Sequence, residues 1–286
     1  MALPPPLEAE VSGLELQPAG RLTLYRAGPA ATGVPLLLLH SVNAAASAYE
    51  VRPLFEHFAR SREVYALDWP GFSLSERRDI PYLPELFVES LLSALERIGR
   101  PADLVALSLG GEFAAAAALR APERFRSLTI VSPTGLGRRR PSPSARAYRA
   151  LSFPLWAQPI FDLLASPASI RAFLKRSFVG APDPGLVAHS IRSAHQPGAL
   201  RAPFWFLSGA LFSPDALELY RKLPCPGLIL YDQDGYTSFE RLPELVSSSA
   251  WKAVRIVPSK GLPHFERLAE TVAALENFWI TLGGNA

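Results

Sequence analysis

A serine in the middle of the chain has the surroundings of a catalytic nucleophile. Ser108 follows a short apolar run, residues 104–107, and precedes two glycines and an alanine-rich segment, residues 112–119. A strand that turns sharply into a helix in this way presents the hydroxyl at the strand end, beside helix N–H groups that favour negative charge. The pattern is Ala106-x-Ser108-x-Gly110, with alanine at one position where glycine is expected. Taken alone, this pentapeptide fits an ordinary strand-to-helix loop equally well.

A serine hydroxyl needs two further groups before it can attack a carbonyl at neutral pH. A base must accept its proton, and an acid must orient that base. Asp232 and Asp234 follow the apolar run at residues 227–231, and His264 comes after them in the chain. One particular fold uses serine, aspartate and histidine in this chain order.

The periodicity of apolar residues predicts the elements that would position these side chains. The expected strands are residues 11–16, 22–25, 34–39, 63–68, 104–107, 127–131, 227–231 and 253–257. The expected helices are residues 45–60, 83–98, 112–119, 215–222, 242–247 and 265–280. This alternation predicts an α/β fold with a mostly parallel central sheet, helices on both faces and an antiparallel first pair of strands. Functional groups collect at the carboxyl ends of such strands.

The alternation of strands and helices stops between residues 137 and 212. This stretch is rich in arginine, proline and large apolar residues, and it is too apolar for a linker. We expect it to form an inserted helical cap, with residues 1–136 and 213–286 forming the core. Trp156 and Phe161 are candidate substrate-binding residues, because an aromatic cap makes an apolar pocket, although such residues equally suit the cap's own core. Arg138 to Arg140 could attract an acidic substrate, but a solvated loop is favoured.

Together these features resemble the α/β-hydrolase superfamily, in the form of a serine hydrolase with a helical cap. The markers are the apolar strand ending in His40-Ser41, the Asp68-x-x-Gly71-x-Ser73-x-Ser75 turn, the Ser108 turn, the acidic loop after Tyr231, and His264 before the last helix. The resemblance extends over nearly the whole chain outside the cap. It implies that Ser108 is the nucleophile, that His264 is the general base and that His40 is structural.

The resemblance also distinguishes the two aspartates. The family loop places its acid near the far end, before a small residue, which favours Asp234 as the orienting acid. Asp232 would then cap the loop backbone. The dehalogenase and epoxide-hydrolase branches of the fold carry an aspartate nucleophile, so the serine at position 108 argues against both branches.

An oxyanion that develops on the attacked carbonyl needs preorganised N–H donors. The resemblance suggests the backbone N–H groups of Leu109 and Val42. Here the chain departs from the family, which usually has glycine after the histidine where this chain has Ser41. Because serine adopts positive φ less readily than glycine, the resemblance does not determine the backbone conformation of this loop. Asn43 could add a side-chain donor, or it could simply stabilise the turn.

Composition and charge argue against several other classes of protein. The net charge is +3 with one short basic cluster, so we expect no nucleic-acid partner. The sequence has no metal-ligand cluster and no glycine-rich phosphate motif, so no cofactor is implied. The single cysteine, Cys225, excludes an intrachain disulfide. Without a signal peptide or an apolar run of membrane-spanning length, we expect a cytoplasmic protein that takes a small-molecule substrate and has no membrane partner. The sequence does not indicate an oligomeric state.

Three functions are compatible with these residues. The one we expect is hydrolysis of a small or medium apolar carboxylic ester through an acyl-enzyme. The second uses the same three residues to cleave a carbon–carbon bond, a lactone or a thioester, or to act as a lyase, because the fold does not separate these reactions. The third is a scaffold that binds a small molecule without turnover, which the departures at Ser41 and Ala106 keep open.

Overall fold

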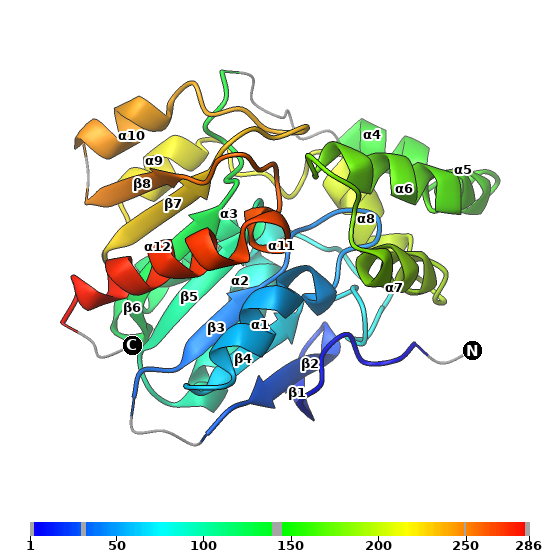
Figure 1. Cartoon of the computed structure of the whole chain (residues 1–286). Coiled ribbons are helices and arrows are strands. Elements are labelled where there is room, and N and C mark those ends of the chain that lie inside the picture. The colour runs from blue at the N-terminus through cyan, green and yellow to red at the C-terminus, as the bar shows by residue number, and fades with distance from the viewer. Residues whose placement is uncertain (1–2, 30–32, 139–144, 249, 284–286) are drawn as a thin grey trace.

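One mixed sheet organises the chain. The computed structural model describes residues 3–29, 33–138, 145–248 and 250–283, and in these ranges eight strands pair in the order β1-β2-β4-β3-β5-β6-β7-β8 (Figure 1). The strands are β1 (Glu10–Leu16), β2 (Gly20–Ala27), β3 (Leu36–Leu39), β4 (Val64–Asp68), β5 (Ala102–Leu107), β6 (Phe125–Val131), β7 (Gly227–Tyr231) and β8 (Trp251–Arg255). The β1–β2 and β2–β4 pairs are antiparallel and the others are parallel. The predicted sheet is therefore confirmed.

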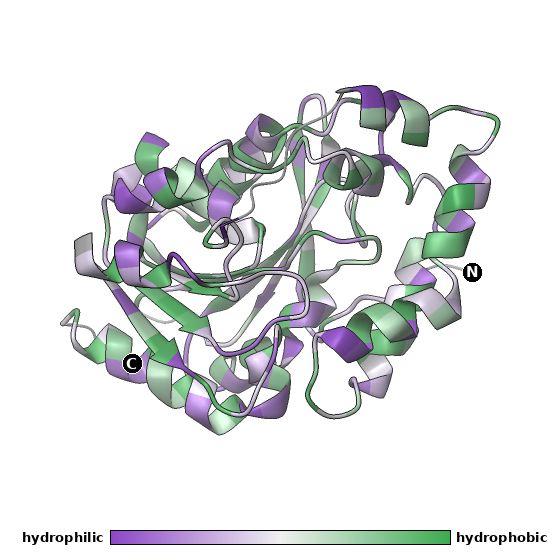
Figure 2. Ribbon diagram, turned by 90° about the horizontal axis from the view of Figure 1, so that it is seen from above, coloured by the Kyte–Doolittle hydropathy of each residue, from purple (hydrophilic) through white to green (hydrophobic). Residues whose placement is uncertain are grey.

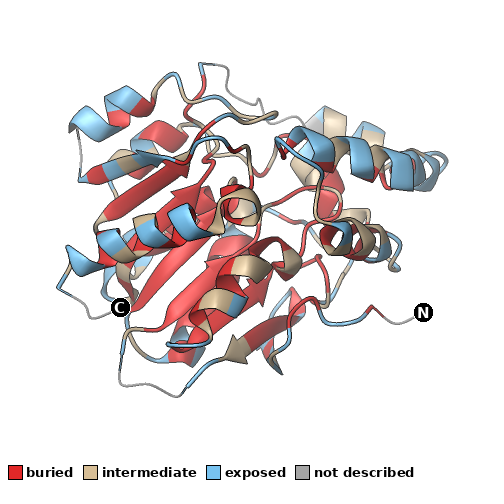
Figure 3. Cartoon of the chain, in the orientation of Figure 1, coloured by how far each residue is buried: buried red, intermediate tan, exposed pale blue. Residues whose placement is uncertain are grey.

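Helices cover both faces of this sheet. They are η1 (Ala48–Val51), α1 (Arg52–Phe58), α2 (Pro84–Ile98), α3 (Gly110–Arg120), η2 (Pro122–Arg124), α9 (Ala216–Arg221), α10 (Leu242–Ser248), α11 (Pro263–Glu266) and α12 (Leu268–Ile280). Helices α2, α3, α9 and α10 lie on one face, and α1 and α12 lie on the other (Figure 1). Successive strand residues serve the two hydrophobic cores in turn, since Leu37 joins the first and Leu38 the second. Figure 3 shows the strands buried between the helices.

Helices also fill the stretch that was predicted to form a cap. In its described part these are α4 (Ala145–Leu151), α5 (Ala157–Leu164), α6 (Pro167–Arg176), α7 (Pro184–Ala194) and α8 (Arg201–Leu207). They lie together beside one end of the sheet and carry both hydrophobic and hydrophilic residues (Figures 1 and 2). Gly71 follows β4, and a Cβ there would lie 2.6 Å from Ala202 of α8. Helix α8 of this stretch thus contacts the loop at the carboxyl end of β4. Arg139 and Arg140 lie outside the described residues.

The last helical segment is divided, unlike the single helix expected over residues 265–280. Pro263 occupies the first turn of the short helix α11, and Arg267 interrupts the helix with φ −136° before α12 begins. Proline suits the first turn of a helix because its missing N–H would be unsatisfied there anyway. His264 therefore lies inside a helical turn and not in the loop before the last helix. No helix in the described ranges has the length and apolarity needed to cross a bilayer.

Two glycines allow α3 to pack closely against the sheet. A Cβ at Gly110 would lie 2.9 Å from the His40 carbonyl oxygen, and one at Gly111 would clash with the Ile130 side chain of β6. Neither glycine has positive φ, so the requirement is for space and not for an unusual backbone conformation. This close approach fixes the position of the turn that carries Ser108.

We predict that Gly111→Ala lowers the free energy of unfolding by about 1–3 kcal/mol, because the added methyl forces Ile130 out of its packed position. Urea denaturation measures the change. Leu119→Ala on the same helix is the control, since Leu119 is 41% exposed and its loss should change stability by no more than about 0.5 kcal/mol. Equal stability of the two variants would contradict the packing argument.

Candidate active site

The turn at Ser108 has the predicted geometry. Ser108 is half-buried, directly follows β5 and adopts φ +51°, which is uncommon for a residue other than glycine. Its N–H donates to the Val131 carbonyl at 2.9 Å, and its carbonyl accepts from Gly111 N–H at 3.0 Å. Such backbone strain costs of order 1–3 kcal/mol and concentrates at functional sites. Alanine at position 106 is accommodated, because Ala106 is fully buried and pairs in register with β3 and β6.

The two predicted oxyanion donors lie in loops at the carboxyl ends of neighbouring strands. Leu109 precedes α3, and Val42 belongs to the loop after β3. Both residues are buried, and within the described chain neither backbone N–H donates to another protein group. Both N–H groups are therefore free to donate to a ligand. Their part in an oxyanion hole stays a prediction.

A buried glutamate holds the loop after β3. Glu50 accepts hydrogen bonds from the Ser41 N–H and from Asn43 Nδ2, both at 2.8 Å. Asn43 Oδ1 accepts from Ala45 N–H at 2.8 Å, so the Asn43 amide is committed within the loop, as in the turn-stabilising alternative. Ser41 does not adopt positive φ, so glycine is not required there. Burial raises the pKa of Glu50.

His40 is a structural residue, in agreement with the expectation from the resemblance. Its Nδ1 lies 2.6 Å from the Ser41 carbonyl oxygen, and its Nε2 accepts from Trp69 N–H at 3.0 Å. The Trp69 indole N–H donates in return to the His40 carbonyl at 2.8 Å. Burial lowers the pKa of His40 to about 3, which keeps the ring neutral. His40 thereby braces the loops after β3 and β4 against each other.

The two aspartates after β7 have different surroundings. Asp232 accepts from Arg255 Nε at 2.8 Å and from Ser259 N–H at 2.9 Å, so each of its oxygens has a partner. Asp234 Oδ1 accepts from the backbone N–H groups of Tyr236 and Thr237, whereas Oδ2 accepts no hydrogen bond from the described part of the chain. Burial raises the pKa of Asp234, although the two N–H donors and the nearby Ser132 hydroxyl oppose this effect. Asp234, unlike Asp232, therefore has a carboxylate oxygen that could still accept a hydrogen bond from an imidazole, which supports Asp234 as the candidate orienting acid.

His264 is bonded to a different group from those predicted. Its side chain is fully buried in α11, and Nε2 lies 2.6 Å from the backbone carbonyl oxygen of Glu50. Nδ1 has no hydrogen-bond partner among the described residues, and burial lowers the pKa of His264 to about 4. The imidazole is therefore bonded neither to Ser108 nor to Asp234. The physical reason is that α11 turns residue 264 towards η1 and leaves Gly261 opposite Asp234, where a Cβ would lie 2.8 Å from Oδ2.

The two aromatic cap residues contact other parts of the cap. Trp156 is 41% exposed, and its Nε1 donates to the Ala150 carbonyl at 2.7 Å. Phe161 is fully buried and meets Phe204 edge to face, with ring centroids 5.9 Å apart. These contacts are those of cap surface and cap core. A role for either residue in binding substrate stays a prediction.

Sequence reasoning missed two residues of this region, Glu50 and Gly261. Glu50 was detectable in principle, because an acidic residue within the mostly apolar stretch from Ala44 to Val51 has to find hydrogen-bond donors once it is buried. Gly261 gave no comparable signal, since glycine before a short helix is common and its position opposite Asp234 is set by the tertiary structure.

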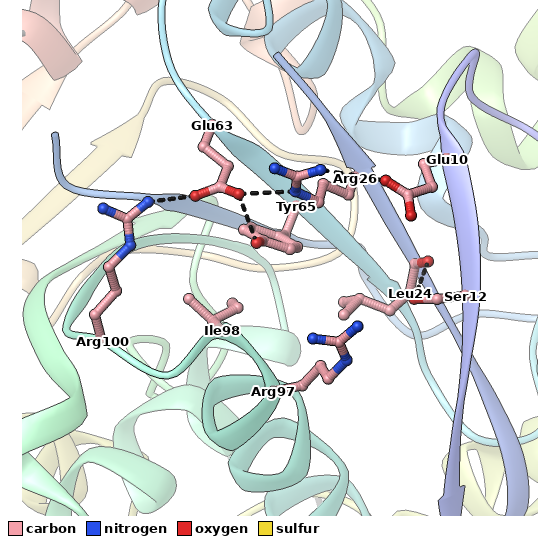
Figure 4. A pocket seen from close by; sticks show the side chains of 9 residues that line it. All are labelled: Glu10, Ser12, Leu24, Arg26, Glu63, Tyr65, Arg97, Ile98 and Arg100. Atoms are coloured by element: carbon pink, nitrogen blue, oxygen red, sulfur yellow. Dashed lines mark hydrogen bonds and ion pairs between the residues drawn. The ribbon is translucent and has the colours of Figure 1, made fainter. Parts of the chain in front are cut away.

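A polar hollow of about 510 Å³ lies at the other end of the sheet. Glu10, Arg26, Glu63 and Arg100 surround it, together with five further residues (Figure 4). Arg26 Nε donates to Glu63 at 2.7 Å, and Arg100 also pairs with Glu63. Glu63 precedes β4 and Arg100 precedes β5, whereas Ser108 follows β5. The hollow is thus separate from the candidate active site.

Comparison with known proteins supports the resemblance. The sequence model described as the alpha/beta hydrolase family matches residues 36–275. The carboxylesterase CesB from Bacillus subtilis has a similar structure, with a TM-score of 0.74 and 18% identity over 95% of this chain and 92% of that chain. At this level of identity the structural similarity demonstrates the fold alone.

Two curated relatives are named 2-hydroxymuconate semialdehyde hydrolase. The protein from Pseudomonas sp. (strain CF600) is 35% identical over 128 residues, which cover 43% of this chain and 44% of that relative. The protein from Pseudomonas putida is 28% identical over 214 residues, which cover 73% of this chain and 69% of that relative. The match to the first relative therefore spans less than half of its length.

The environment of His264 predicts a pH dependence of stability. The pKa of His264 is about 4 in the folded protein and about 6.5 in the unfolded chain, so as the pH falls below 6.5 the unfolded state gains a proton first. Stability should therefore fall between pH 6.5 and 4, with about 3 kcal/mol of the loss due to this residue. Urea denaturation at several pH values in this range should show that the free energy of unfolding depends less steeply on pH in His264→Gln than in the parent protein. Gly111→Ala, which carries no titrating change, should keep the slope of the parent. If the free energy of unfolding had the same pH dependence in the parent and in both variants, a pKa of about 4 for His264 would be contradicted.

Proposed function

Because this chain belongs to the α/β-hydrolase family, we propose that it binds a small or medium apolar carbonyl compound against Ser108 and hydrolyses it, with a carboxylic ester as the preferred substrate. The observation that carries this proposal is the strained turn at Ser108, where a half-buried serine with φ +51° directly follows β5. The free N–H group of Leu109, directly after Ser108, supports the same reading.

In the proposed reaction Ser108 Oγ adds to the ester carbonyl carbon. The carbonyl oxygen becomes an oxyanion, which the N–H groups of Leu109 and Val42 stabilise. Collapse of this intermediate breaks the ester C–O bond. The proton lost by Ser108 passes to the departing alkoxide, so that the alcohol is released and an acyl group stays on Ser108. Water then hydrolyses the acyl-enzyme, releasing the carboxylic acid and restoring the serine. The contacts of His264 give no support for its predicted role as the base in these steps.

Cleavage of a carbon–carbon bond is the second candidate reaction, and the curated relatives favour it. A 2-hydroxymuconate semialdehyde contains an aldehyde and a carboxylate but no ester, so its hydrolysis must break a carbon–carbon bond. The same nucleophile and oxyanion donors suit both reactions, because each begins at a carbonyl carbon. Turnover of vinylogous diketones in preference to p-nitrophenyl esters would select the second reaction.

We predict that a fluorophosphonate probe labels Ser108 at one site per chain. Peptide mapping identifies the modified residue, and Ser108→Ala should abolish the labelling. Ser132 also adopts positive φ, at 49°, but it is buried, and it serves as the control because Ser132→Ala should keep the labelling. A folded parent protein that resists the probe over long incubation, and that turns over neither esters nor vinylogous diketones, would contradict the proposed function.

A further inference from the structure

The residue that faces the free oxygen of Asp234 has no side chain. A Cβ built on Gly261 would lie 2.8 Å from Asp234 Oδ2, and the nearest atom of any other residue, Ser177 Cβ, is 3.6 Å away. Gly261 does not adopt positive φ, so its backbone accepts an L side chain without strain. Only the far end of the Asp234 side chain would have to move, by some tenths of an ångström.

The histidine nearest in sequence is held away from this position. His264 Nε2 must carry the proton of the hydrogen bond to the Glu50 carbonyl oxygen, because a carbonyl only accepts. That tautomer leaves Nδ1 without a proton to donate to Asp234. The ring is also fully buried and belongs to a helix whose first turn is fixed by Pro263. Bringing it to Asp234 would require this hydrogen bond to break and α11 to rearrange.

We propose that position 261 is the place from which an imidazole would link Asp234 to Ser108. Because this chain has glycine there, it reacts without a base that Asp234 orients. The inference rests on the proposed function and specifies how it operates. In the native protein the Ser108 proton passes through solvent water to the leaving alkoxide as the ester C–O bond breaks. A second water then cleaves the acyl-enzyme to the carboxylic acid and regenerates the serine.

The native reaction is accordingly slow. A positioned acid–base group accelerates proton transfer about 10²–10⁴-fold, and this is the contribution that the chain lacks. An oxyanion hole and substrate binding alone still leave a rate above that in water. An imidazole introduced at position 261 would donate from Nδ1 to Asp234 and accept the Ser108 proton at Nε2.

Gly261→His tests the inference directly. The rate of fluorophosphonate labelling and kcat/KM for p-nitrophenyl acetate should both rise about 10²-fold. The gain should appear as the pH rises through the range in which imidazole loses its proton. Gly261→Ala adds the same Cβ without the ring and should give no gain. Asp234→Asn in the Gly261→His background should remove most of the gain, because the ring loses its orienting acceptor.

His264→Gln provides a second test, because the glutamine side-chain amide can still donate a hydrogen bond to the Glu50 carbonyl. The native labelling rate should be unchanged in this variant. A folded His264→Gln protein that loses all labelling would overturn the inference by identifying His264 as the base, while the proposed function would stand. A folded Gly261→His protein that reacts no faster than Gly261→Ala would also overturn it. The proposed function fails separately if the folded parent is not labelled at Ser108 over long incubation and turns over neither esters nor vinylogous diketones.

Discussion

Glu50 connects the two loops on which the candidate site depends. Its carboxylate accepts from the Ser41 N–H and from the Asn43 amide, while its backbone carbonyl accepts from His264. A buried carboxylate is costly unless hydrogen bonds satisfy it, so the loop after β3 has little freedom to move away. The same residue therefore shapes the proposed oxyanion donors and draws the imidazole away from Asp234. The proposed nucleophile, Ser108, is held in its turn, but none of the described residues is a base hydrogen-bonded to it.

The parts of the molecule that depend on local pattern could be predicted from the sequence. The strand at residues 227–231 was located at its observed bounds, because it is a continuous apolar run closed by polar residues. The Ser108 turn was recognised from a strand, two glycines and a helix, all within a few residues. His40 was identified as structural from the resemblance, and its contacts with Trp69 confirm that role. Each of these inferences needed only near neighbours in the chain or a strong family pattern.

The position of the imidazole could not be derived in this way. Gly261 and His264 are only three residues apart, and the direction of each depends on where α11 begins. The partner that holds His264 is 214 residues away in the sequence, so no local pattern reports the contact. Trp156 and Phe161 show the same limit, because aromatic composition predicts an apolar cap but does not distinguish the pocket from the cap's own contacts.

The hydrogen-bonded state of His264 tests the account most directly. Nitrogen-15 NMR of the imidazole identifies its tautomer and follows its titration in the parent protein and in Asp234→Asn. The account predicts a neutral ring protonated at Nε2, a pKa of about 4, and no change on loss of the Asp234 charge. A ring protonated at Nδ1, with a pKa that falls in Asp234→Asn, would show a conventional triad and contradict the account.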